Sequence, residues 1–359
     1  MKGLAVSEIP DLVNSTLPHF KNRGKFEAAF ELQQYYFLDE VFQKDKYQVQ
    51  DGRSIEFNVV LDDNGTARHT KLFSTRTRNM RDVLKQGSQN WCFADAEAYY
   101  EAHLLTMNRG ASAKAKYIKI QYFAAYKSLA NLLERRAVLA PEDANDQENP
   151  NGLLWWFSML ASGQQDDTGG FNGKLARYGD GTTTTTIGGI DANLNPLWRN
   201  WVATYSGVID IDTTNTLRRG MIATKFVRPK SVKDLDNGGP ASKWRVLWSL
   251  RHQAEYEELV NSGSDKRNGD LNPFADMITF RGVRTVGLPT LETVSNSPII
   301  VCNFAHFMPC VHSDWWMKED EPMRDVDQRH VYVQGIDCQY NYLADNRREM
   351  GFILHTKIA

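Results

Sequence analysis

The clearest helical pattern of apolar and polar positions runs through residues 111–140. Apolar residues recur there every three or four positions, and Lys and Arg fill most of the remaining places, which predicts an amphipathic helix. The predicted buried stripe consists of Ile118, Tyr122, Ala125, Leu129 and Leu132 or Leu133. Pro141 ends the pattern. A helix of this length spans about 45 Å, so it can serve as a spine for other elements.

A second pattern, with period two, begins at Ile55 and Phe57, which alternate with polar residues. Asp-Asn-Gly at 63–65 tolerates the positive φ angles of a tight turn, and the pattern resumes through Leu72 and Phe73. This predicts a long hairpin over residues 55–73. Because an isolated two-stranded ribbon is at best marginally stable, it must pack on something. If nothing else in the chain covers it, we expect Ile55 and Phe57 to contact another copy of the chain.

The rest of the chain mixes helices and strands, which predicts an α+β fold. Residues 1–23 indicate an extended arm. Phe26, Phe30, Phe37 and Val41 have the spacing of a short helix. The Gly-, Asp- and Thr-rich residues 161–190 indicate a loop region and the best domain boundary. Further predicted helices cover 216–227 and 252–261, and further predicted strands cover 244–250, 277–288 and parts of 331–355.

Composition and charge restrict the class of protein. The chain has 359 residues, 42% apolar and 24% charged, with a formal net charge of −2. These values indicate a folded chain and exclude a strong overall electrostatic grip on nucleic acid. Four cysteines without a C-x-x-C pair indicate a reducing cytoplasm as the place of synthesis. The N-terminal residues lack the apolar core of a signal peptide, and no apolar run has the length of a membrane span.

Charge is unevenly distributed. A basic cluster beside the predicted hairpin consists of Arg76, Arg78, Arg81 and Lys85. By contrast, the charged residues of 141–150 are all acidic, and most of those of 314–327 are acidic. We predict that the three arginines meet carboxylates of a neighbouring chain. The double variant Arg76→Glu with Arg78→Glu is therefore expected to block assembly at physiological salt, and normal assembly would contradict the prediction.

Few motifs indicate chemistry. Gly169–Lys174 (GGFNGK) lacks the spacing and the Ser/Thr of a phosphate-binding loop. His306, Cys310, His312 and Asp314 include residue types that bind zinc, but their order matches no common site, so a strand with partly buried polar residues is the alternative. No nucleophile elbow and no H-E-x-x-H pattern occurs. We therefore predict no catalytic residue, no metal and no cofactor.

The stretch Ile187–Val202 (IGGIDANLNPLWRNWV) follows five consecutive threonines. Its glycines suit a turn, and its Trp and Arg residues are types found both at contact hot spots and in protein cores. We predict that Trp198 packs inside the subunit. Arg199 is a candidate for contact with a neighbouring subunit, with packing inside its own subunit as the alternative.

Three stretches, taken in order, resemble the major capsid proteins of tailed bacteriophages, which have the Hong Kong 97-type coat fold. They are TTIGGIDANLNPLWRNWV, ITFRGVRTVGLP and PIIVCNFAHFMPCVHSDWW. The resemblance implies an N-terminal arm and short helix (1–43), an extended E-loop (44–108), a peripheral domain with the spine helix (109–150), an axial domain (151–290) and C-terminal strands of the peripheral domain (291–359).

The resemblance also implies the function. The chain would self-assemble through pentamers and hexamers into the icosahedral shell around the double-stranded DNA of a tailed phage, after synthesis in the bacterial cytoplasm. It implies no enzymatic activity, a separate scaffolding protein, a portal at one vertex, decoration proteins in some members, weak contact with DNA and no membrane. Lys71 leaves covalent crosslinking open. The alternatives are a virion-associated zinc enzyme that uses residues 306–314 and a minor virion structural protein.

Overall fold

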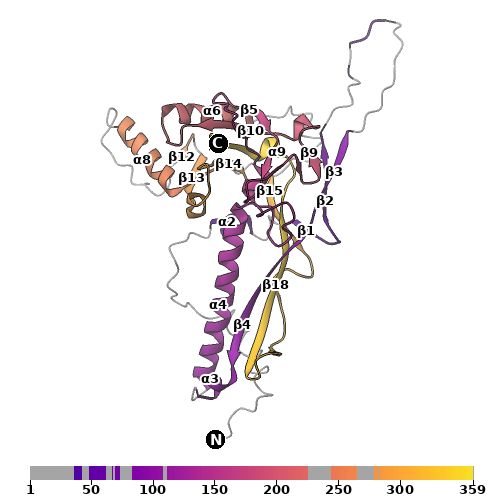
Figure 1. Ribbon diagram of the computed structural model, residues 1–359, viewed down its shortest axis with the longest axis vertical. Helices are drawn as coiled ribbons and strands as arrows, with labels where there is room; N and C mark the ends of the chain where they lie inside the picture. The colour runs from indigo at the N-terminus through magenta and orange to yellow at the C-terminus, as the bar shows by residue number, and fades with distance from the viewer. Residues whose placement is uncertain are drawn as a thin grey trace.

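The computed structural model describes residues 36–42, 48–61, 67, 69–72, 83–107, 111–224, 244–264, 279–281 and 283–358. In Figure 1 these residues form an elongated molecule with a wide end and a narrow end. The helices are α2 (Tyr36–Val41), α3 (Ala102–Met107), α4 (Ala111–Val138), α5 (Leu153–Trp156), α6 (Ile211–Thr224), α8 (Leu250–Ser264) and α9 (Arg347–Met350). Two short 3-10 helices are η2 (Pro196–Trp198) and η3 (Pro289–Glu292). The mixed α+β fold class is confirmed.

The narrow end consists of α4 packed along a sheet (Figure 1). Among the described strands, this sheet contains β1 (Gln48–Gln50), β4 (Cys92–Glu101), β15 (Phe307–His312), β16 (Lys318–Glu319), β17 (Met323–Arg324) and β18 (Val331–Ala344). The long strand β18 pairs with β4 along one edge and with β15, β16 and β17 along the other. β4 alternates buried and exposed positions, as expected for a sheet with one face on a helix.

The predicted spine helix is confirmed as α4. Its inward side chains Ile118, Tyr122, Ala125, Leu129 and Leu133 are buried. Leu132, by contrast, is 39% exposed, so the stripe continues through Leu133. On the N-terminal side, α2 buries Phe37 and Val41, in agreement with the predicted spacing. Residues 1–23, Phe26 and Phe30 lie outside the described residues.

The wide end contains a seven-stranded mixed sheet in the order β12-β13-β11-β14-β19-β10-β5. Its strands are β5 (Gly170–Gly173), β10 (Asn200–Tyr205), β11 (Trp244–Trp248), β12 (Thr279–Phe280), β13 (Val283–Gly287), β14 (Ile299–Asn303) and β19 (Gly351–Thr356). All residues of β10 and β14 are buried because both faces of the sheet are covered. On one face, a hydrophobic core includes Leu217 and Met221 of α6 and Tyr256 of α8.

The prediction that the second strand of the hairpin runs through Leu72 is wrong. β2 (Ile55–Val60) pairs antiparallel with β3 (Leu84–Gln89), with Ile55 opposite Gln89 and Val60 opposite Leu84. Residues 69–72 form no strand, and Asp63–Gly65 and Phe73 lie outside the described residues. β3 reads LKQGSQ, and this polar sequence has no apolar alternation by which the pairing could be recognised.

The Gly- and Thr-rich segment 161–190 is more ordered than the predicted loop. It supplies the edge strand β5 and the short pairs of β6 (Ala176–Arg177) with β7 (Thr183–Thr184) and of β8 (Thr186–Ile187) with β9 (Ile190–Asp191). The predicted elements near 216–227, 244–250, 252–261 and 277–288 correspond to α6, β11, α8 and β12 with β13. Residues 291–359 divide between both sheets, since β14 and β19 join the strands of the wide end. They therefore do not belong to the narrow end as one block.

Candidate functional site

The ribbon of β2 and β3 has one face on the body of the molecule and one face in solvent. Ile55 is fully buried and Phe57 is 9% exposed, so both pack within their own chain. The body of the same chain covers the face on which they lie, so the condition for their contact with another copy is not met. The outward face carries Glu56, Asn58, Val60, Leu84, Gln86 and Ser88.

A glycine turn holds the base of the ribbon. Gly188 and Gly189 join β8 to β9 with φ angles of 62° and 79°, the left-handed values that a two-residue hairpin turn requires. The Ser88 amide donates a hydrogen bond to the Gly188 carbonyl at 3.1 Å. A Cβ atom on Gly87 would lie 2.3 Å from the Phe57 ring and 2.6 Å from that carbonyl, so only glycine allows this close approach.

Aromatic rings pack against the Gly188–Gly189 turn. The Phe57 ring lies stacked on Trp198 at 6.2 Å between centroids and edge-on to Trp156 at 6.4 Å. Trp198 is 1% exposed, and its indole N–H donates to the Ile187 carbonyl at 3.0 Å. The prediction that Trp198 packs inside the subunit is confirmed. The stretch Ile187–Val202, which contains Trp198, therefore joins the ribbon to the wide end.

Arg199 turns back onto its own loop. Its Nε donates to the Ala192 carbonyl at 2.8 Å and its Nη2 to the Asn193 carbonyl at 2.9 Å. Two donors of the guanidinium thus stabilise the loop between β9 and η2. Arg199 is half-buried, and a role in contact with a neighbouring subunit stays a prediction.

Arg347 occupies the centre of this junction and was not recognised from the sequence. It is fully buried, and its guanidinium makes five hydrogen bonds among the described residues. The acceptors are the Trp156 carbonyl, bonded twice, the Trp198 carbonyl, Ser158 Oγ and Asn200 Oδ1. Burial lowers the pKa of Arg347 to about 9, which leaves it charged at neutral pH. Arg347 therefore links α5, η2 and β10 to α9.

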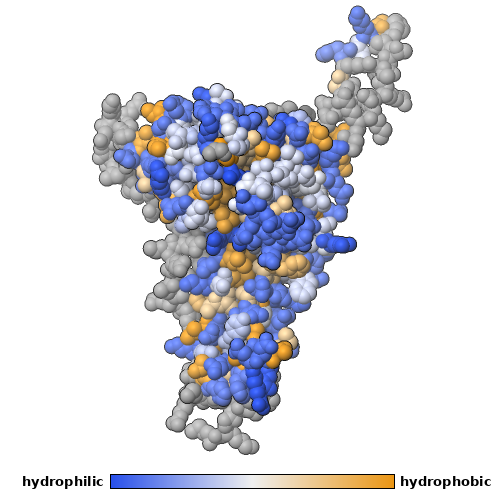
Figure 2. Space-filling view, viewed as in Figure 1, coloured by the Kyte–Doolittle hydropathy of each residue, from blue (hydrophilic) through white to orange (hydrophobic). Residues whose placement is uncertain are grey.

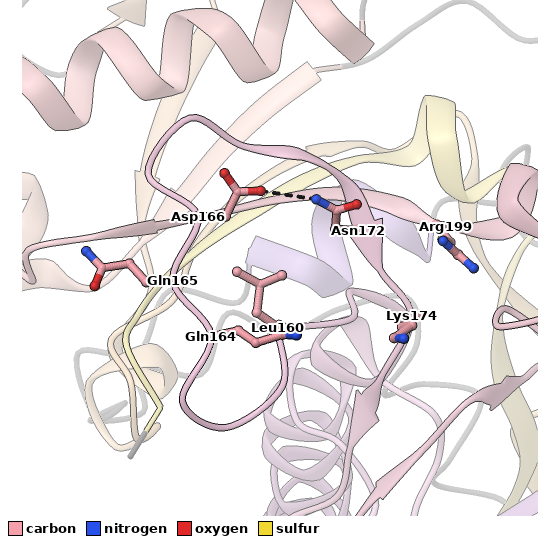
Figure 3. Close-up of a pocket in the computed structure, with 7 residues that line it drawn as sticks. All are labelled: Leu160, Gln164, Gln165, Asp166, Asn172, Lys174 and Arg199. Atoms are coloured by element: carbon pink, nitrogen blue, oxygen red, sulfur yellow. Dashed lines mark hydrogen bonds between the residues drawn. The ribbon is translucent and has the colours of Figure 1, made fainter.

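A polar pocket of about 380 Å³ opens beside β5 (Figure 3), lined by Leu160, Gln164, Gln165, Asp166, Asn172, Lys174 and Arg199. Lys174 and Arg199 lie toward one end, and Gln165 lies at the other. Asp166 accepts hydrogen bonds from Gly169 N and Asn172 Nδ2 at 2.9 and 3.1 Å. Within the described part of the chain, Lys174 and Arg199 form no ion pair. The pocket therefore brings two cations near one carboxylate, and no nucleophile–base pair is among its lining residues.

The structure does not bring the candidate zinc ligands together. His306 lies between Asp345 and Glu349, at 2.9 and 3.2 Å. Cys310 is a buried thiol whose pKa burial raises to about 12, and His312 contacts the Trp91 ring. No group of three or more His, Cys, Asp or Glu residues among those described is arranged to hold a metal ion.

The His306 cluster predicts a pH-dependent stability. Burial lowers the pKa of His306, but its hydrogen bonds to Asp345 and Glu349 outweigh this effect and raise the pKa to about 9. The protonated ring stabilises the fold fully below its ordinary pKa of 6.5, and this contribution is lost as the pH rises through about 9. Because Asp345 is partly exposed, we expect a loss of about 1–2 kcal/mol.

Thermal unfolding between about pH 6 and pH 9.5 measures this loss, with His306→Gln as the matched control. The wild-type melting temperature should fall toward the variant's as the pH rises. Parallel pH profiles for the two proteins would contradict the assignment.

The basic cluster is described only in part. Lys85 lies on β3 and is half-buried, whereas Arg76, Arg78 and Arg81 lie outside the described residues. All four cysteines are buried free thiols, as expected for a chain without a disulfide framework. None of the described helices is long and apolar enough to cross a membrane.

No protein-family model and no curated protein sequence matches the chain. Its structure is similar to solved phage particle structures over almost its whole length. The cyanophage A-1(L) capsid chain is 13% identical at a TM-score of 0.59, with 94% of this chain and 96% of that chain covered. A chain of Mycobacterium phage Bobi is 9% identical at 0.51, covering 94% and 96%. A chain in the capsid of a native GTA particle is 10% identical at 0.50, covering 94% and 95%.

Proposed function

We propose that this chain, which has the Hong Kong 97-type fold of tailed-phage major capsid proteins, is the subunit of an icosahedral shell that encloses phage DNA. The observation that carries the proposal is the similarity of fold from end to end, since a shared single domain would cover only part of each chain.

The shape of the subunit supports the proposal. The described residues form an elongated body with a narrow end, and the ribbon of β2 and β3 lies at one side of the wide end with its outward face in solvent (Figure 1). Shell subunits use such surfaces in heterologous contacts, which close by rotational symmetry. The outward face of the ribbon carries two exposed apolar side chains, Val60 and Leu84, opposite each other. We propose that this face, rather than Ile55 and Phe57, contacts the adjacent subunit.

The proposal also assigns a role to each part of the chain. The arm and short helix of 1–43 and the loop of 44–108 would reach neighbouring subunits, with Arg76, Arg78, Arg81 and Lys85 against carboxylates. Residues 109–150 would supply the spine of the peripheral domain, and 151–290 would form the axial domain, to which β14 and β19 also belong. We also propose that the chain forms pentamers and hexamers. Its proposed partners are a separate scaffolding protein, a portal, a decoration protein and, through weak contact, the packaged DNA. Synthesis in the host cytoplasm, location in the virion and the absence of enzymatic activity and cofactors belong to it too.

Imaging of the assembled protein tests the proposal. The chain is expressed alone and together with the gene products encoded beside it, and the particles are examined by size-exclusion chromatography and electron microscopy. We expect closed shells, or rings of five and six subunits. A monomer in both preparations would overturn the proposal, whereas a connector ring or a fibre would support a minor virion protein instead.

A further inference from the structure

The outward face of α6 has no partner within the described chain. Ile211 and Ile222 are 68% and 67% exposed, and the exposed Arg218 lies between them on the same face of the helix. Arg219 is exposed beside it, and Val208, just before the helix, is exposed as well. Among the described residues, Arg218 donates a hydrogen bond to Asn215 Oδ1 at 3.4 Å, and neither arginine forms an ion pair. The exposed Asp212 lies in the first turn of the helix, so this face is apolar with an excess of positive charge.

The outward face of α8 has the opposite charge. Leu250 and Val260 are each 45% exposed, and Ala254 and Glu258 are exposed between them. Glu257 accepts a hydrogen bond from Gln253 Nε2 at 3.2 Å, but no cation among the described residues pairs with Glu257 or Glu258. The one base of the described part of α8, Arg251, already pairs with Glu255 at 2.9 Å. The face of α8 is therefore apolar and acidic.

The opposite charges of the two faces do not pair with each other within the described part of one chain. Both helices lie at the wide end (Figure 1), and their inward residues share one hydrophobic core. Nevertheless, no ion pair joins Arg218 or Arg219 to Glu257 or Glu258 among the described residues. Figure 2 shows hydrophobic residues scattered among hydrophilic ones over this end of the molecule.

We propose that α6 of one copy docks on α8 of the next copy around a rotation axis. Contact of α6 with α6 would join two faces with an excess of positive charge, and contact of α8 with α8 would join two faces with an excess of negative charge. Both like-charge contacts are unfavourable, whereas α6 on α8 is complementary in charge and buries apolar side chains on both sides. Such a contact is heterologous, and it closes into a ring where the rotation from one copy to the next is a whole fraction of a turn. This inference rests on the proposed function and names the surfaces that join subunits within a ring.

Charge reversal tests the pairing. One variant combines Arg218→Glu with Arg219→Glu, another combines Glu257→Lys with Glu258→Lys, and a third carries all four changes. At about 150 mM salt we expect each double variant to reduce the yield of rings and shells at least tenfold, and the fourfold variant to restore most of it. The conservative control, Arg218→Lys with Arg219→Lys, should assemble like the wild type.

Folding and function are checked separately. Each variant should keep its melting temperature within about 2 °C, because all four side chains are solvent-accessible. Double variants that assemble normally, or a fourfold variant that does not recover, would overturn the α6–α8 contact while leaving the proposed function intact. Failure of the wild type to form rings or shells would overturn both.

Discussion

Replacement of Arg347 by Met is expected to destabilise the subunit by about 3–5 kcal/mol. The variant removes all five hydrogen bonds of the guanidinium, which are donated to the Trp156 and Trp198 carbonyls, Ser158 Oγ and Asn200 Oδ1. Asn200 Oδ1 keeps one donor, the Ser158 backbone N–H at 3.1 Å. These groups are buried and cannot turn to water. Because the acceptors belong to α5, η2 and β10, we expect the junction between the ribbon and the wide end to loosen first.

Chemical denaturation and hydrogen exchange measure this effect. Arg347→Lys should recover only part of the stability, because one ammonium cannot reach acceptors that surround a planar guanidinium. Arg348→Met is the matched control: the adjacent arginine is partly exposed and donates to the Pro196 carbonyl at 3.2 Å. We expect it to cost about 1 kcal/mol or less. Equal losses for the two positions would show that Arg347 has no special role.

Replacement of Gly351 by Ala is expected to cost about 3 kcal/mol or more. Gly351 follows α9 with a φ angle of 136°, which side chains rarely adopt. A Cβ atom there would lie 1.9 Å from the Val301 carbonyl oxygen. That oxygen belongs to the backbone of β14, which is paired with β11 on one side and β19 on the other, so it cannot move away.

The matched control is Gly52→Ala. Gly52 has a φ angle of 112°, but a Cβ atom there meets nothing within 4 Å. The pair of variants therefore separates backbone strain from the steric clash. We expect Gly52→Ala to cost about 1 kcal/mol and to leave assembly unchanged, whereas Gly351→Ala should yield little soluble protein. Similar melting temperatures for the two variants would contradict the predicted clash.

Elements with a long internal pattern could be predicted from the sequence. The stripe from Ile118 to Leu133 predicted α4, and the apolar runs around Phe280 and Val286 predicted β12 and β13. In both cases the pattern is local, because it can be recognised from residues that are close together in the chain. The α+β fold class followed from the mixture of such elements, whereas the Hong Kong 97-type fold was implied by the resemblance of three stretches of sequence, taken in order.

Pairings across long stretches of chain could not be predicted in this way. β2 pairs with the polar β3, although the nearer residues around Leu72 continue the apolar alternation. A polar strand is selected there because Gly87 lets Phe57 lie against the Gly188 turn. The same limit applies to charge: the sequence shows that α6 is basic and α8 acidic, but only the structure shows which of these charges remain without partners.

The sequence by itself determined the helical spine, the class of fold and the absence of a strong net charge, because these depend on local periodicity and composition. The tertiary structure alone decided that Ile55 and Phe57 face inward, that His306 pairs with Asp345 and Glu349, and that Arg347 lies at the centre of the junction. Each of these contacts joins residues far apart in the chain, so its energy depends on distances that no local pattern encodes.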